Sequence, residues 1–372
     1  MTSVSESVAR WSPPVRPELA GLEPYGAPQL DVPVCLNVNE NPYGPTPTAV
    51  ADIAAAVAQA AASLNRYPDR EALALRAALA DYINSRALPP AAPRLTAANL
   101  WAANGSNEVM TQILGAFGGP GRTMLTFPPT YSMYPEYARA THTELRTFDR
   151  RDDFTLDAEE VAAHVAATAP DVVMLTSPNN PTGTAAPAEL LIAILAAAPG
   201  IVVVDEAYAE FARDGGACAL DLLADHRNLI VTRTMSKAFA LAGARLGYAI
   251  ADPLVIDALR LVRLPYHLSA VTQATALAAL GHADDLLAQV DLLRSERDRV
   301  VGWLRGQGLT VADSDANFAL FGDLDDRHAV WQGLLDRGVL IRETGPDGWL
   351  RVSIGTPAEN DAFMTALQEV LA

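Results

Sequence analysis

The feature that most constrains the fold is an alternation of short apolar runs with alanine-rich segments of helical length. The runs are rich in β-branched residues and cover residues 99–105, 122–127, 171–177, 201–207, 228–234 and 247–252. Apolar runs without polar alternation predict strands buried on both faces, and helices between such strands predict parallel connections. We therefore expect an α/β fold with a large, mostly parallel sheet covered by helices.

The pattern changes after about residue 265, where a long helical stretch with a polar face begins. Two strand-like runs, "FALFGD" and "WLRVSIG", and a terminal helix follow it. This order predicts a smaller α+β domain over residues 266–372, after a large domain over residues 41–265. The proline-rich residues 1–40 are expected to form an N-terminal arm that contributes to the smaller domain. A length of 372 residues also favours two domains over one.

Charge and composition exclude several classes of protein. The formal net charge of −17 leaves no basic face for nucleic acid. The two cysteines, Cys35 and Cys218, have no disulfide or metal-ligand spacing, so we expect no metal. The first 21 residues lack the apolar core of a secretory signal, and the apolar runs are too interrupted to span a membrane, so a cytoplasmic enzyme is expected. No G-x-G-x-x-G follows a strand near the N-terminus, which argues against a nicotinamide-dependent dehydrogenase.

Lys237 is the only lysine, because the other 26 of the 27 basic residues are arginines. A coding bias toward arginine explains the missing lysines but not the one that is present. Arginine keeps its proton in proteins, whereas a lysine amine can lose its proton and condense with a carbonyl. Lys237 follows a predicted strand and Ser236, and a glycine-containing loop with Arg245 comes after it. This setting predicts covalent chemistry at Lys237; chance survival of one lysine is the alternative.

Polar residues follow the predicted strands at their carboxyl ends, where ligands gather in parallel sheets. Pyridoxal phosphate needs a carboxylate at its ring nitrogen and donors at its phenolic oxygen. Asp205 ends a buried strand, and a protonated ring nitrogen would supply the cation that its burial requires. Tyr208 and Asn180 could both reach the phenolic oxygen. The alternatives are a helix cap for Asp205 and a simple turn for Asn180.

The same cofactor needs a flat partner for its ring and a cradle for its phosphate. Gly105, Ser106 and Asn107 open a helix directly after a strand, which suits a phosphate group. Tyr131 follows two prolines at another strand end and could stack on the ring. Plain helix capping and core packing are the respective alternatives.

Taken together, these positions resemble the fold-type I pyridoxal-phosphate-dependent aminotransferases. The segments "SPNNPTG", "VDEAY" and "RTMSKAFALAGARLGY" occur in that family's order. Within the superfamily the chain is most similar to histidinol-phosphate aminotransferases, through "LNVNENPYGP", "NRYPDR", "WAANGSNE", "TYSMY" and "VRLPYHLSAVTQA". The similarity runs from about Tyr25 to the C-terminus.

The resemblance implies further roles in cofactor binding. Lys237 would carry the cofactor covalently and move a proton during the reaction. Thr234, Ser236 and Arg245 would hold the phosphate together with Ser106 and Asn107. Tyr67 would reach that phosphate from the neighbouring subunit, which implies a homodimer; without the resemblance, Tyr67 is an ordinary aromatic residue in a turn.

It also implies roles in substrate binding. Arg351 matches the arginine that binds the α-carboxylate of the amino-acid donor, and Arg342 matches the one that binds the substrate phosphate. Tyr25 matches an arm residue that closes over the substrate, and Asn39 lies in the rim of the site. The surroundings of Tyr134 are expected to line the side-chain pocket. Surface salt bridges are the alternative for both arginines.

The implied activity is a reversible, ping-pong transfer of an amino group from glutamate to imidazole-acetol phosphate, which gives 2-oxoglutarate and histidinol phosphate in histidine biosynthesis. The nearest alternative is an aromatic amino-acid aminotransferase of the same subgroup, in which Arg342 would be idle. Another is a pyridoxal-phosphate enzyme with a different outcome, such as a decarboxylase. From a different class, a non-catalytic regulator built on this fold is not expected, because such regulators carry an added basic helix-turn-helix domain for which the 372 residues leave no room.

Overall fold

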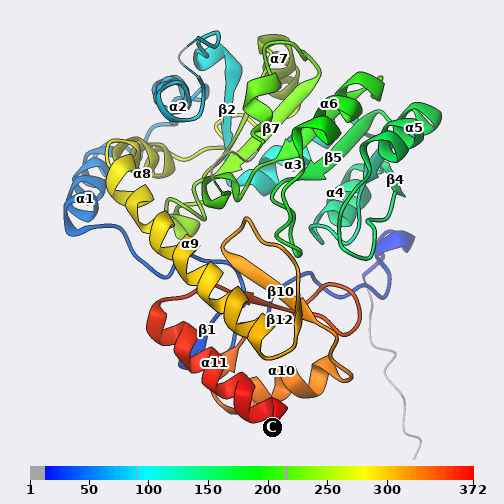
Figure 1. The fold of residues 1–372 in the computed structure, drawn as a ribbon. Helices are drawn as coiled ribbons and strands as arrows, with labels where there is room; N and C mark the ends of the chain where they lie inside the picture. Colours follow the sequence, from blue (N-terminus) through cyan, green and yellow to red (C-terminus); the bar gives the residue numbers. More distant parts are fainter. Residues whose placement is uncertain (1–12, 90, 214–216) are drawn as a thin grey trace, which may run out of the picture.

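The structure, a computed structural model, describes residues 13–89, 91–213 and 217–372. The chain forms two lobes (Figure 1), with a seven-stranded sheet in the upper lobe and a four-stranded sheet in the lower one. The predicted α/β architecture, a large and mostly parallel sheet with a smaller α+β part, is confirmed.

The upper sheet has the strand order β2-β8-β7-β6-β5-β3-β4. Its strands are β2 (Leu100–Ala103), β3 (Thr123–Thr126), β4 (Glu144–Thr147), β5 (Val172–Thr176), β6 (Ile201–Asp205), β7 (Leu229–Thr234) and β8 (Gly247–Ala251). All neighbours are parallel except β8, which runs antiparallel to both β2 and β7. The edge strand β4 was not predicted, because its residues are half-buried or exposed and form no apolar run.

Helices cover both faces of this sheet. Successive residues of β6 point to opposite faces: Val202 and Val204 pack in the hydrophobic core on one face, and Val203 packs in the core on the other. The first face is covered by α2 (Leu73–Arg86), α5 (Ala158–Thr168), α6 (Ala188–Ala197) and α8 (Ala270–Leu280). The second is covered by α3 (Ser106–Phe117), α4 (Tyr134–Thr141) and α7 (Pro253–Val262). Helix α1 (Pro47–Ala61) packs beside α8.

The lower lobe is built on an antiparallel sheet of order β12-β13-β10-β9. Its strands are β9 (Thr310–Val311), β10 (Phe318–Gly322), β12 (Arg342–Glu343) and β13 (Leu350–Ser353). A separate parallel pair joins β1 (Val34–Cys35) to β11 (Val339–Leu340), so part of the N-terminal arm belongs to this lobe. Its helices are α9 (Ala283–Gly306), α10 (Arg327–Asp336) and α11 (Pro357–Leu371).

Helix α9 runs from the upper lobe into the lower one (Figure 1). Its residue Leu286 packs in the core of the large sheet, whereas Leu293 packs in the core of the lower lobe. Helix α8 also packs on the large sheet through Ala276 and Ala279, although it follows residue 265. The boundary at residue 265 stays a prediction.

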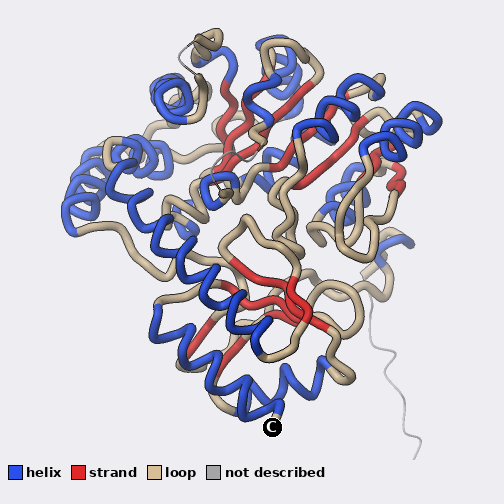
Figure 2. The backbone as a smooth tube through the Cα atoms, in the orientation of Figure 1, coloured by secondary structure: helices blue, strands red, loops and turns tan. Residues whose placement is uncertain are grey.

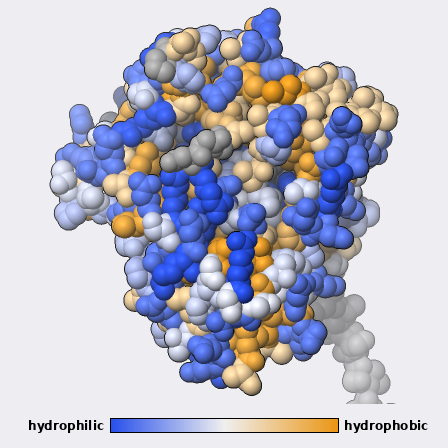
Figure 3. All heavy atoms as spheres, in the orientation of Figure 1, coloured by the Kyte–Doolittle hydropathy of each residue, from blue (hydrophilic) through white to orange (hydrophobic). Residues whose placement is uncertain are grey.

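Loops and short helical turns gather where the carboxyl ends of the large sheet face the lower lobe (Figure 2). The short 3-10 turns are Pro17–Leu19, Ala97–Asn99, Ala209–Phe211, Ala219–Leu222 and Ala242–Ala244. Hydrophilic residues cover much of the face along α9 (Figure 3). None of the helices in the described ranges is long and apolar enough to cross a membrane.

Candidate active site

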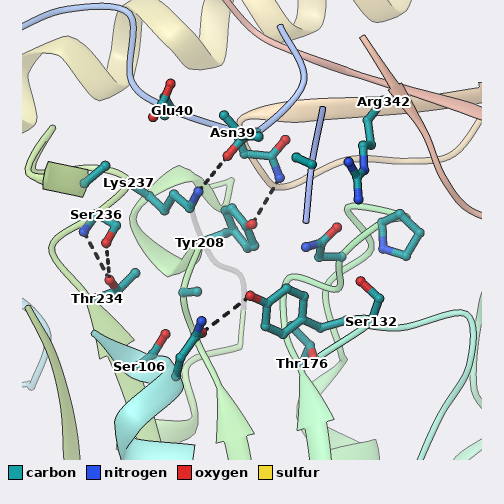
Figure 4. Close-up of a pocket in the computed structure, with 18 of the residues that line it drawn as sticks. Asn39, Glu40, Ser106, Ser132, Thr176, Tyr208, Thr234, Ser236, Lys237 and Arg342 are labelled. Atoms are coloured by element: carbon teal, nitrogen blue, oxygen red, sulfur yellow. Dashed lines mark hydrogen bonds between the residues drawn. The ribbon is translucent and has the colours of Figure 1, made fainter. Parts of the chain in front are cut away.

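A cavity of about 430 Å³ lies between the two lobes, at the carboxyl ends of β5, β6 and β7. Fourteen of the residues predicted for the site line it, from both lobes and the N-terminal arm. They are Tyr25, Asn39, Ser106, Asn107, Tyr131, Asn180, Asp205, Tyr208, Thr234, Ser236, Lys237, Arg245, Arg342 and Arg351. The close-up in Figure 4 shows Lys237 and Tyr208 near its centre and Arg342 entering from the lower lobe.

Lys237 stands in the turn after β7, and its buried neighbours Met235 and Ala238 anchor that turn. Its Nζ donates a hydrogen bond of 2.9 Å to the carbonyl of Val38 and lies 5.9 Å from the centre of the Tyr208 ring. Burial, and after it the positive charge of Arg351, lowers the pKa of Lys237 to about 8. The amine therefore loses its proton far more easily than an exposed lysine.

Asp205 ends β6 at the base of the cavity and is 4% exposed. Its two oxygens accept hydrogen bonds of 3.1 Å from the hydroxyls of Tyr134 and Thr232. Burial raises the pKa of Asp205 to about 6, because both of these partners are neutral. A backbone hydrogen bond from Ala207 also reaches this carboxylate, and none of its partners in the described ranges carries a positive charge, so it suits a cationic ligand atom.

The surroundings of Tyr134 line the cavity, but Tyr134 itself does not. Its side chain is fully buried beneath Asp205, and its hydroxyl contacts both Asp205 and Thr176. Helix α4 begins at Tyr134, which turns this residue toward the sheet core, while Tyr131 and Ser132 before it line the cavity.

The start of α3 and the loops around Lys237 form a pocket rich in hydrogen-bond donors. The hydroxyl of Thr234 donates to that of Ser236 over 3.0 Å, and Nη1 of Arg245 lies 3.5 Å from the Ser236 hydroxyl. Gly105, the residue before α3, has φ of +81°, and a Cβ there would lie 2.7 Å from Nη2 of Arg245. Hydroxyls, a guanidinium and the first N–H groups of a helix are a suitable cradle for phosphate.

Two aromatic residues, Tyr131 and Tyr208, line the cavity. The Tyr131 hydroxyl donates to Oδ1 of Asn107 over 3.4 Å, and the Tyr208 hydroxyl accepts from Nδ2 of Asn39 over 3.1 Å. Burial raises the pKa of Tyr208, so its phenol keeps its proton and can donate it. Asn180 accepts a hydrogen bond from the Arg351 guanidinium through Oδ1, which leaves its NH₂ group as a further donor.

The two predicted substrate arginines reach the cavity from neighbouring strands of the lower lobe. Arg351 is 7% exposed, its Nη2 donates to the carbonyl of Asn37 over 2.9 Å, and its buried Nε has no partner among the described residues. Burial lowers the pKa of Arg351 to about 10. Arg342 donates to the carbonyl of Gly26 over 3.3 Å. Within the described ranges neither arginine pairs with a carboxylate, so both can receive an anion.

The N-terminal arm passes across the cavity. The Tyr25 hydroxyl accepts a hydrogen bond of 2.9 Å from Ser132, on the opposite wall. Ser132, Glu40 and Asn37 also line the cavity and were not predicted. Glu40 and Asn37 stand inside the segment "LNVNENPYGP", and Ser132 stands inside "TYSMY", so these motifs could have identified all three.

Tyr67 lies outside the cavity of its own chain. It is 80% exposed, and its ring stacks on Tyr266 at 4.4 Å between centroids. Its predicted contact with the phosphate of a second subunit stays a prediction.

The residues of the cavity fit pyridoxal phosphate. An amine with a lowered pKa, a buried carboxylate without a cationic partner and a cradle of phosphate donors match the three groups of that cofactor. Among the residues that the structure describes, no three His, Cys, Asp or Glu side chains are grouped to hold a metal ion.

Comparison with known proteins agrees with this geometry. The family model for class I and II aminotransferases matches residues 32–367. The chain belongs to the class I and II aminotransferase family. The predicted enzyme class, a pyridoxal-phosphate-dependent aminotransferase, is thereby confirmed.

Similar proteins agree on the narrower family as well. The chain is 58% identical to histidinol-phosphate aminotransferase 3 of Burkholderia lata, over 99% of this chain and 98% of the relative. It is 60% identical to a histidinol-phosphate aminotransferase of Thermobifida fusca, over 95% and 94% of the two chains. A crystal structure of histidinol-phosphate aminotransferase from Sinorhizobium meliloti, in complex with pyridoxal-5'-phosphate, superposes with a TM-score of 0.81 at 29% identity, covering 91% of each chain. The resemblance predicted from the sequence motifs is confirmed for this aminotransferase.

Proposed function

We propose that this aminotransferase moves the amino group of glutamate to imidazole-acetol phosphate, giving histidinol phosphate and 2-oxoglutarate, with pyridoxal phosphate as cofactor. The observation that carries the proposal is the 58% identity to a histidinol-phosphate aminotransferase across 99% of the chain. The reaction is reversible and runs in two half-reactions on one site. Its place is in histidine biosynthesis.

Bound pyridoxal phosphate supplies an electron sink for the charge that develops at the substrate α-carbon. The Asp205 carboxylate would hold a proton on the ring nitrogen, and Tyr131 would pack against the ring. Lys237 would carry the cofactor, and its Nζ would accept a proton from the substrate α-carbon. The pKa of about 8 leaves a share of this amine uncharged at neutral pH, as a general base requires.

The substrate groups are held by the lower lobe. Arg351 receives the α-carboxylate of glutamate, and its unpartnered Nε supports this role. Arg342 receives the phosphate of the second substrate in exchange for its contact with the Gly26 carbonyl. Tyr25 closes the site over the substrate from the arm.

A homodimer is part of the proposal, with Tyr67 completing the phosphate cradle of the partner. Tyr67 and Tyr266, which stack on each other, are 80% and 40% exposed, and Leu261 and Leu264, shortly before Tyr266 in the chain, are 85% and 73% exposed. Exposed apolar side chains of this size support association with another chain. The cytoplasmic location also stays a prediction.

The test is a substrate panel on the purified protein together with Arg342→Ala. We expect turnover of histidinol phosphate with 2-oxoglutarate to exceed that of phenylalanine by far. Loss of one charge-assisted contact to phosphate should lower kcat/KM for histidinol phosphate by about tenfold to a hundredfold and leave phenylalanine nearly unchanged.

Arg337→Ala is the matched control, because Arg337 pairs with Glu369 on the surface of the same lobe. Equal or reversed preference between the two substrates in the wild type, or no loss in Arg342→Ala, would support an aromatic amino-acid aminotransferase. Release of carbon dioxide would support a decarboxylase.

A further inference from the structure

Three buried polar residues link the lower lobe to the cavity by hydrogen bonds. The backbone N–H of Asn39 donates to Oγ of Ser353 over 2.8 Å, and that hydroxyl donates to Oδ1 of Asn39 over 2.9 Å. Nδ2 of Asn39 then donates to the Tyr208 hydroxyl over 3.1 Å, which Figure 4 shows. Ser353, Asn39 and Tyr208 are 3%, 2% and 5% exposed, so water does not compete with these bonds.

The chemistry of these groups sets the direction of each hydrogen bond. The Ser353 hydroxyl already accepts the N–H of Asn39, so its single proton must go to an acceptor, which is Oδ1. This contact fixes the amide of Asn39 with its NH₂ group toward Tyr208. Because the Tyr208 oxygen accepts that N–H, its own proton is left for another acceptor. Within the described ranges this proton has no acceptor, and Tyr208 lines the cavity.

We propose that Ser353 is a positioning residue for amino transfer, which acts by orienting Asn39 so that Tyr208 donates its proton into the cavity. The inference rests on the proposed function, in which the acceptor is the phenolic oxygen of bound pyridoxal phosphate. Without the Ser353 hydroxyl the Asn39 amide can rotate, and Oδ1 then accepts the Tyr208 proton. The cofactor loses a hydrogen bond although Tyr208 itself is unchanged.

Ser353 lies on β13, the strand that also carries Arg351. Side chains two residues apart in a strand share a face, so Ser353 and Arg351 both face the cavity side of β13. The segment between the lobes contacts both, since Arg351 donates to the carbonyl of Asn37 and the backbone N–H of Ser353 donates to that of Leu36. One strand therefore holds the substrate carboxylate and also orients the donor to the cofactor.

The experiment is a pH titration of the visible absorbance of protein-bound pyridoxal phosphate in wild type and Ser353→Ala. A hydrogen bond to the phenolic oxygen weakens the hold of that oxygen on the proton it shares with the Lys237 nitrogen. Loss of the donor should raise the midpoint by about one pH unit, which is tenfold in proton affinity. We expect kcat to fall while KM for glutamate stays near the wild-type value, because Arg351 is untouched.

Two further variants separate positioning from general loosening. Ser353→Thr keeps the hydroxyl and should restore the wild-type midpoint. Ser314→Ala removes a hydroxyl that is 1% exposed and bonds within its own lobe, so it should leave the midpoint unchanged. Ser353→Cys, whose thiol is a weaker donor in the same space, gives the same measurement should Ser353→Ala not fold.

The outcomes distinguish the inference from the proposed function. A wild type that binds no pyridoxal phosphate overturns the proposed function. A Ser353→Ala protein that binds the cofactor with the wild-type midpoint overturns the positioning role alone, as does an equal shift in Ser314→Ala. A Ser353→Cys protein with the wild-type midpoint also overturns the positioning role.

Discussion

Asp205→Asn is expected to stabilise the cofactor-free protein and at the same time to remove its hold on pyridoxal phosphate. The carboxyl has its pKa raised from 3.8 to about 6 by burial, so its ionised form is less favourable in the folded chain than in the unfolded one. A difference of about two pKa units corresponds to about 3 kcal/mol of unfolding free energy. Asparagine has the same shape and no charge, so the variant avoids this cost.

The sign of the pH dependence follows from proton binding. Between pH 3.8 and about 6 the folded protein holds the Asp205 proton and the unfolded chain does not, so wild-type stability falls as pH rises through this range. Relative to Asp205→Asn, the deficit of the wild type is absent at pH 4 and largest above pH 6. We expect this deficit in unfolding free energy to reach at most about 3 kcal/mol. The difference is reduced by any hydrogen-bond energy that the variant loses when the hydroxyls of Tyr134 and Thr232 face an amide instead of a carboxylate.

The assay is urea unfolding of both cofactor-free proteins at pH 4, 5, 6 and 8, with the exposed Asp225→Asn as control. Added pyridoxal phosphate should reverse the order of stability, because only the wild type can pair with the protonated ring nitrogen. The reasoning is refuted if Asp205→Asn is the less stable cofactor-free protein at pH 8. It is also refuted if the difference in unfolding free energy does not change between pH 4 and pH 8.

Two further predictions concern the surroundings of the cofactor. Because the pKa of Lys237 is lowered to about 8, the rate at which cofactor-free protein captures pyridoxal phosphate should rise about tenfold per pH unit below pH 8 and level off above it. Stopped-flow absorbance measures this capture rate. A capture rate that is still rising at pH 10 contradicts the prediction. A Cβ at Gly247 would lie 2.1 Å from the backbone nitrogen of Ser106, so Gly247→Ala should cost about 1–3 kcal/mol and weaken cofactor binding. Gly302→Ala, where nothing lies within 4 Å, is its control in thermal unfolding and cofactor titration, and equal behaviour of the two variants would contradict the steric argument.

The large sheet was predictable because its signal is local. Residues 201–207 are mostly apolar, and this composition alone predicts a strand buried on both faces. The structure has β6 at Ile201–Asp205. Strand β4 gave no such signal, since it lies at the edge of the sheet. The antiparallel direction of β8 was also not foreseen, because apolar composition does not encode strand direction.

The residues of the candidate site also differ in whether the sequence alone could predict them. Lys237 and Asp205 were found from residue type and from their position after a strand, which the chain order contains. Ser353 was not found, although it lies in the strand-like run "WLRVSIG", because its partner Asn39 is 314 positions away and the sequence does not show that the two residues meet. Contacts between the arm and β13 exist only once both lobes have folded.

The charge of the cavity explains how a chain with net charge −17 binds anions. Six charged residues line it, four cationic and two acidic: Lys237, Arg245, Arg342, Arg351, Glu40 and Asp205. Arg351 and Arg245 also help to lower the pKa of Lys237. An anion paired with these arginines cancels part of that effect and makes Nζ a stronger base. If Arg351 binds the substrate carboxylate as proposed, that binding would strengthen Lys237 as a proton acceptor at the step where the α-proton has to be removed, which a lysine far from any arginine could not achieve.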